Sequence, residues 1–151
     1  MIQINYNIEE KNWKKHFPQF KKYIGKAVNE TLKQIDTKLD EDVFVSIFLT
    51  SNKKIKKLNH QYRNKNKPTN VLSFPMQSSS DGIYLLGDIV LSNQTLLKES
   101  IEQNVTKYDY LCKMTIHGML HLLGYDHNTE KQFQKMNKFE NTIFKMIKKN
   151  K

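Results

Sequence analysis

The stretch VTKYDYLCKMTIHGMLHLLGYDH, residues 105–127, decides the fold. The segment between Val105 and Leu123 is predicted to be a helix, with apolar residues on nearly every side, at Tyr108, Tyr110, Leu111, Met114, Ile116, Leu120 and Leu122. A helix that is apolar nearly all round is expected to be buried. Gly124 suits the left-handed turn just past a helix end. The rest of the chain must therefore supply the layers that cover this helix.

The flanking segments predict a sheet and further helices. Period-two alternation and β-branched runs predict strands over 1–8, 42–50, 71–74 and 84–91, the third ended by Pro75. Apolar spacing of three and four residues and capping residues predict helices over 20–35, 51–62 and 129–148, with a short helix from Asn93 or Thr95. We therefore expect one α+β domain over residues 1–151, with a mixed sheet of about four strands packed with about five helices.

The composition restricts the compartment and the partners. The chain has 25 basic and 15 acidic residues, a formal net charge of +10. RNA or DNA would complement this charge, and a compositional bias of the genome toward lysine is the alternative source of many of these lysines. Cys112 is the single cysteine, which excludes an internal disulfide and fits a reducing cytoplasm. No run of about 18 apolar residues occurs, so no membrane span is predicted and a cytoplasmic protein is expected.

Three histidines around the end of the central helix have the spacing of metal ligands. His117 and His121 are four residues apart and so lie on one helical face, and the turn at Gly124 can bring His127 round as a third ligand. Three neutral imidazoles with water in the fourth position form a catalytic zinc arrangement, here on a zincin-like helix. Histidines used as ordinary packing residues would explain one of them, but explain three at this spacing poorly.

The same spacing occurs in metzincin proteases, which suggests a metalloprotease as one alternative. In those enzymes the residue after the first histidine is a glutamate that serves as general base, and here that residue is Gly118. Peptide hydrolysis by the usual route therefore loses its base. A metal could still lower the pKa of a water toward about 7 without that glutamate.

The single arginine is a candidate for phosphate binding. Of the 25 basic residues only Arg63 is arginine, which leaves 25 − 1 = 24 lysines. A planar guanidinium can bind a phosphate with two parallel hydrogen bonds, and lysine cannot replace it there. Nearby Lys65 and Lys67 could hold flanking phosphates. A surface arginine left by chance and a solvated lysine loop are the alternatives.

Four blocks of the chain resemble the YbeY family of bacterial, metal-dependent, single-strand-specific endoribonucleases. These blocks are LNHQYRNKNKPTNVLSFP (58–75), LGDIVLS (86–92), HGMLHLLGYDH (117–127) and MNKFE (136–140). The resemblance implies Zn²⁺ at His117, His121 and His127, and Arg63 as a functional residue in a basic groove beside the metal. It also implies single-stranded RNA as the substrate, maturation of the 3′ end of 16S rRNA on the ribosome or its small subunit, and a part in ribosome quality control.

Some roles stay open at the level of sequence. The family block usually has an aspartate at the position of Asn70, so a ligand-orienting charge is lost there unless the residue only caps a turn. Glu140 falls on an apolar stripe and could hydrogen-bond a metal histidine, a backbone group or a lysine. A non-catalytic RNA-binding ribosome-assembly factor with a structural metal is the alternative function. The native metal, the choice between water and the RNA 2′-hydroxyl as nucleophile, and the oligomeric state are not determined by these patterns.

Overall fold

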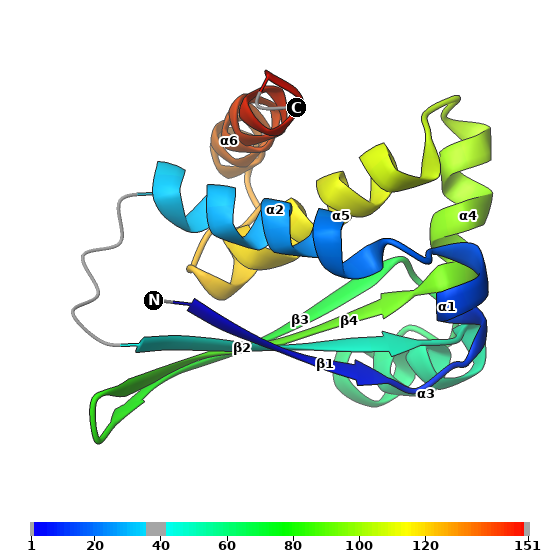
Figure 1. Cartoon of the computed structure of the whole chain (residues 1–151), viewed down its shortest axis with the longest axis horizontal. Helices are drawn as coiled ribbons and strands as arrows, with labels where there is room; N and C mark the ends of the chain where they lie inside the picture. Colours follow the sequence, from blue (N-terminus) through cyan, green and yellow to red (C-terminus); the bar gives the residue numbers. More distant parts are fainter. Residues whose placement is uncertain (1, 36–41, 150–151) are drawn as a thin grey trace.

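A computed structural model of the chain describes residues 2–35 and 42–149, and these form one α+β domain. The prediction of the fold class is thereby confirmed, and Figure 1 shows helices packed on both faces of one sheet. Along the chain the elements are β1 (Ile2–Ile8), α1 (Asn12–His16), α2 (Phe20–Gln34), β2 (Asp42–Thr50), α3 (Asn52–Arg63), β3 (Val71–Ser80), β4 (Ile83–Ser92), α4 (Asn93–Glu102), α5 (Lys107–Leu122) and α6 (Glu130–Lys149).

The sheet is mixed, with the strand order β1-β2-β4-β3. The pairs β1–β2 and β2–β4 are parallel, whereas β3 runs antiparallel to β4. Strand β3 therefore lies at one edge of the sheet.

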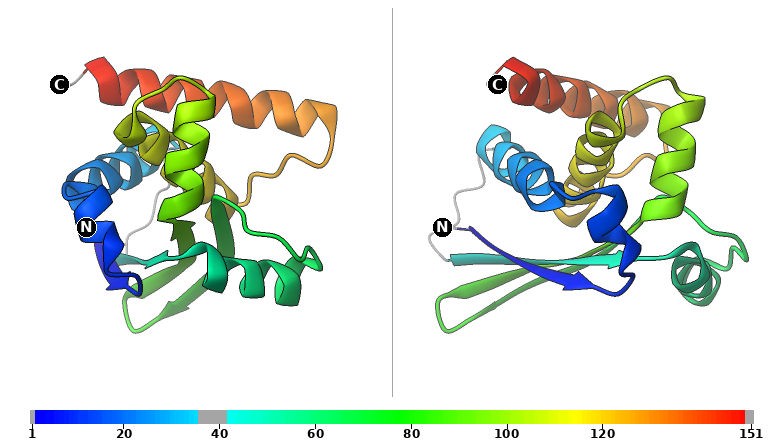
Figure 2. Two further views of the ribbon diagram at one scale, coloured as in Figure 1. Left: turned by 90° about the vertical axis from the view of Figure 1, so that its right-hand side faces the viewer. Right: turned by 45° about the vertical axis from the view of Figure 1, so that its right-hand side comes forward.

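The two faces of the sheet carry different helices. On one face Val45 and Ile47 of β2 belong to the main core together with Ile24 of α2 and Leu111 of α5. On the other face Ile55 of α3 packs against the sheet, in a smaller cluster of three buried residues with Leu72 and Val90. Figures 1 and 2 show the same division, with α2, α5 and α6 on one side and α3 on the other. Alternation of side chains along each strand produces this division.

Helix α5 is the central element of the helical side. It packs against α2, α4 and α6 and against strands β3 and β4. Nine of its residues are buried, from Tyr110 to Leu122, as the apolar pattern predicts. Its first turn is capped by Thr106, whose hydroxyl accepts a hydrogen bond of 3.1 Å from the backbone N–H of Asp109. None of the helices in residues 2–35 and 42–149 is both long and apolar enough to cross a membrane.

Two features differ from the predicted elements. Strand β3 continues past Pro75 to Ser80, because an edge strand tolerates a residue without an N–H and a bulge follows at once. The register shifts between Pro75 and Ser78, and Gln77 in the bulge has a φ of 48°. The short helix α1 was not predicted, because its five residues are too few to show a helical period.

Candidate metal centre and active site

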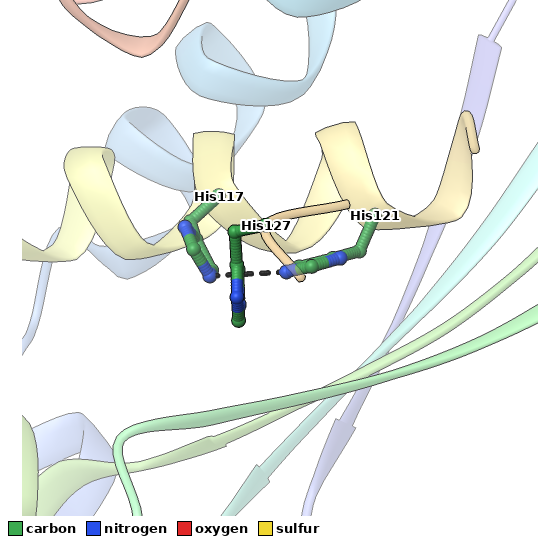
Figure 3. A group of neighbouring side chains, drawn as sticks. All are labelled: His117, His121 and His127. Carbon is green, nitrogen blue, oxygen red and sulfur yellow. Dashed lines mark hydrogen bonds between the residues drawn. The ribbon is translucent and has the colours of Figure 1, made fainter. Parts of the chain in front are cut away.

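The histidines meet because the chain reverses at the end of α5. His117 and His121 lie on one face of the helix, and Gly124 follows it with a φ of 98°. The backbone N–H of Tyr125 donates to the carbonyl of Leu120 at 3.0 Å, which closes the helix end. The chain then returns beside its own last turns, so that His127 faces the other two rings (Figure 3).

The three rings form a donor set for one metal ion. One ligand nitrogen from each of His117, His121 and His127 lies within 4.8 Å of the other two. The Nε2 atoms of His117 and His121 are 3.2 Å apart. Three imidazole nitrogens this close together match the ligands that catalytic zinc sites use, and zinc keeps its fourth position open in such sites. The residues present therefore fit the metal that the spacing predicts.

Glu140 of α6 fixes the orientation of His117. Its carboxylate hydrogen-bonds Nδ1 of His117, 23 residues earlier in the chain. A carboxylate can only accept a hydrogen bond, so Nδ1 of His117 is the donor in this contact, and Nε2 is the nitrogen that faces His121. Of the partners considered for Glu140, the structure selects the histidine.

The electrostatics around His121 favour its neutral form. Burial lowers the pKa of His121 to about 4, and the nearby His117 and His127 add to the effect. A neutral ring is the form that binds a metal, since a protonated nitrogen has no lone pair.

The basic residues predicted to bind phosphate lie on the connection after α3. Arg63 is the last residue of that helix, and Arg63, Lys65 and Lys67 are all exposed. The side-chain amide of Asn59, a buried residue, donates to the carbonyl of Lys67 at 2.9 Å. In this way a buried group holds the backbone of an exposed basic loop.

No hydrogen bond or ion pair within the described part of the chain joins Arg63 to the histidines. The left-hand view of Figure 2 shows the C-terminal end of α3 and the N-terminal end of α6 projecting on the same side of the molecule, one below the other. The histidine cluster precedes α6 directly in the chain.

A second polar cluster links this basic connection to the helical layer. The Asn70 amide donates to Glu99 of α4 at 2.8 Å, and the Tyr110 hydroxyl donates to the same carboxylate oxygen at 2.6 Å. Burial, followed by the hydrogen bond to Glu99, raises the pKa of Tyr110 to about 12, so the hydroxyl stays a donor. Asn70 thus supplies an N–H that an aspartate lacks. The sequence does not predict the role of Glu99, because nothing in the residues around it indicates that Asn70 and Tyr110 are its partners.

Gly118 faces the sheet. A Cβ atom at this position would lie 3.2 Å from the side chains of Ile89 and Ser73, and the Ser73 hydroxyl donates to the Gly118 carbonyl at 3.2 Å. The position that carries the general base in zincin proteases is therefore packed against β3 and β4. This packing argues against a metalloprotease.

Comparisons with known proteins agree with this geometry. The family model for Endoribonuclease YbeY matches residues 6–148. The chain is 37% identical over 154 residues to Endoribonuclease YbeY of Bartonella bacilliformis, with 97% of this chain and 94% of that protein covered. It is 42% identical over 139 residues to Endoribonuclease YbeY of Pelagibacter ubique, with 89% and 79% covered.

A solved structure shares the fold. The solution structure of TM1509 from Thermotoga maritima superposes with a TM-score of 0.54 at 29% sequence identity, over 99% of this chain and 93% of that one. Together with the family match over almost the whole length, these relatives show that the chain belongs to the Endoribonuclease YbeY family.

Proposed function

We propose that this protein is a zinc-dependent endoribonuclease that cuts single-stranded RNA at the histidine cluster. The observation that carries the proposal is the convergence of His117, His121 and His127 in a member of an endoribonuclease family. Its proposed biological role is maturation of the 3′ end of 16S rRNA on the small ribosomal subunit, with a part in ribosome quality control. This role belongs to the cytoplasm.

The three histidines would hold one Zn²⁺, with Glu140 orienting the ring of His117. When bound, such an ion supplies Lewis acidity beside the phosphodiester. All three donors are imidazoles rather than carboxylates or thiolates, so the ligands bring no negative charge that would cancel the positive charge of the ion.

Arg63 is proposed as the residue that binds the phosphate undergoing cleavage. Its guanidinium offers two parallel N–H donors to phosphate oxygens, and its positive charge stabilises the charge that develops there. Lys65 and Lys67, exposed on the following loop, are proposed to hold the flanking phosphates. The exposed positions of all three side chains and the net charge of +10 support this assignment.

Cleavage of an end-labelled single-stranded RNA tests the proposal. Wild type, His121→Ala, Arg63→Ala and Arg63→Lys are purified identically, and Arg63→Lys keeps the charge but loses the fork. We expect cutting by the wild type, none by His121→Ala, and a loss of at least about 100-fold in both Arg63 variants. Product termini identify the nucleophile, since attack by the 2′-hydroxyl leaves a 2′,3′-cyclic phosphate.

Three outcomes separate the alternatives. Equal cutting by all four proteins would reveal a contaminating nuclease. RNA binding without cutting, even with added zinc, would contradict the enzyme and support an assembly factor with a structural metal.

For the biological role, small subunits carrying precursor 16S rRNA are incubated with the protein and the 3′ end is mapped. An unchanged end would contradict the maturation role.

A further inference from the structure

Helix α6 begins with an exposed aromatic residue on its inward face. Phe133 is 52% exposed, yet it lies three residues before Met136, which is 2% exposed and part of a core cluster. It also lies seven residues before Glu140, which contacts His117. Residues three, four and seven apart share one helical face. The ring of Phe133 therefore belongs to the face of α6 that meets the histidines, not to its solvent face.

Phe133 lines a small hollow together with two of the proposed metal ligands. The hollow has a volume of about 40 Å³ and is bordered by His117, His127, Phe133, Met136, Asn137 and Glu140. This volume is far below the roughly 300–1,000 Å³ of a pocket that encloses a ligand. A planar group could therefore lie against the exposed ring but could not be enclosed beside it.

A solitary exposed apolar residue needs no functional explanation. Ile101, at the end of α4, is 79% exposed and is such a residue. Phe133 differs because it borders the same hollow as two of the three histidines. Its ring therefore lies beside two of the residues that are proposed to hold the metal.

We infer that Phe133 is a stacking platform for the base of a nucleotide next to the cleaved phosphate. The inference rests on the proposed function and extends it to substrate selection. Aromatic rings stack on any unpaired base, so this contact tolerates all sequences. Paired bases inside a duplex have both faces covered by their neighbours. Phe133 would therefore favour single-stranded over double-stranded RNA at the site of cleavage.

The test compares variants that keep or remove the ring. Phe133→Ala and Phe133→Leu remove it, Phe133→Tyr keeps it, and Ile101→Ala is the control for loss of an exposed apolar side chain elsewhere. We expect Phe133→Ala and Phe133→Leu to lower the kcat/KM for single-stranded RNA by about 5- to 150-fold, with Phe133→Tyr and Ile101→Ala close to wild type. Metal content and Tm are measured for each variant.

A modified RNA locates the contact. A single abasic site is moved along the substrate. At one position it is expected to lower the kcat/KM of the wild type by the same factor as Phe133→Ala does, and not to lower the kcat/KM of Phe133→Ala any further. With 2-aminopurine at that position, RNA bound to His121→Ala is expected to show quenched fluorescence. The quenching should disappear when Phe133→Ala is added to that variant.

The outcomes keep this inference apart from the proposed function. Cutting by the wild type with unchanged kcat/KM in Phe133→Ala would overturn the stacking role and leave the endoribonuclease intact. Loss of metal from Phe133→Ala, or failure of Phe133→Tyr to restore activity, would overturn it in favour of a structural role. A wild type that neither binds nor cuts RNA would overturn both.

Discussion

At the scale of single residues, Glu140 controls the ring of His117 without being a predicted ligand. The substitution Glu140→Gln keeps the shape of the side chain but removes the negative charge that polarises the Nδ1–H of His117. Loss of such a partner typically lowers metal affinity by about 10- to 100-fold. We expect the Kd for Zn²⁺ to rise by this factor, measured by competition with a chromogenic chelator.

Glu102→Gln is the matched control, since Glu102 is an exposed glutamate at the end of α4. Its zinc affinity should equal that of the wild type. Equal affinity in Glu140→Gln and Glu102→Gln would show that the contact between α6 and His117 does not tune the metal site.

Asn70 is the second informative residue, because its amide is matched to Glu99. In Asn70→Asp the donor disappears and a second carboxylate faces Glu99, so we expect a loss of about 1–3 kcal/mol in the free energy of unfolding at pH 7. Adding Glu99→Gln restores a donor opposite the new carboxylate and should recover most of this loss. Urea unfolding of the four proteins in the cycle measures the coupling.

The pH dependence of the Asn70→Asp effect has a definite sign. Two neighbouring carboxylates raise the pKa of one of them, so the penalty is complete at neutral pH and fades as the pH falls through that raised pKa. Asn29→Asp serves as control, since the amide of Asn29 donates to the carbonyl of Gly25 at 2.8 Å on an exposed helix face. A penalty in Asn70→Asp that grows toward acid would contradict the proposed repulsion.

At the scale of elements, the sequence predicts a helix or strand well where its apolar residues repeat regularly. It predicts poorly where the extent of an element depends on its place in the fold. The buried helix α5 and the strand β2 have apolar patterns long enough to predict their type and burial. The extension of β3 beyond Pro75 depends on its place at the sheet edge, which local pattern does not encode. The histidine cluster is predictable because its three members lie within eleven residues around one helix end.

Two glycines near the bulge of β3 are expected to tolerate substitution differently. Gly87 of β4 pairs with Pro75 beside the bulge, and Gly82 lies in the turn between β3 and β4. Gly87 has a φ of 146°, and a Cβ there would lie 2.4 Å from the backbone oxygen of Phe74. Gly82 also has a positive φ, but a Cβ there would meet nothing within 4 Å. We expect Gly87→Ala to cost about 3 kcal/mol or more, and Gly82→Ala about 1 kcal/mol from backbone strain alone. Similar losses of Tm in both variants would contradict close packing at the bulge.

At the scale of the whole molecule, two contacts are made by elements far apart in the sequence: the sequence left the partner of Glu140 open and did not predict that of Glu99. Glu140 reaches His117 from α6, and Glu99 reaches Asn70 from α4. Both contacts depend on how helices pack on α5, and no local spacing in the sequence records that packing. The metal site is therefore coupled to the assembly of the helical layer.

This coupling can be measured through Cys112, the single cysteine of the chain. It is 2% exposed and belongs to the buried cluster that also contains Ala27 of α2 and Met136 of α6. Burial, followed by the charge of Asp109, raises the pKa of its thiol to about 12. A thiol reagent at pH 8 should therefore modify Cys112 only when the helical layer opens.

Zinc should slow that modification, because an ion that binds the folded state alone stabilises it. At a free zinc concentration 100 times the Kd, labelling that proceeds through global opening should slow by about 100-fold. Two of the proposed ligands lie on α5, and Glu140 of α6 contacts one of them, His117. The ion would thus be connected to the helices that cover Cys112. His121→Ala should show no such slowing, measured by mass spectrometry of timed samples. Labelling of the wild type as fast as in denaturant would contradict burial of the thiol. Unchanged rates with zinc would contradict a metal site on α5.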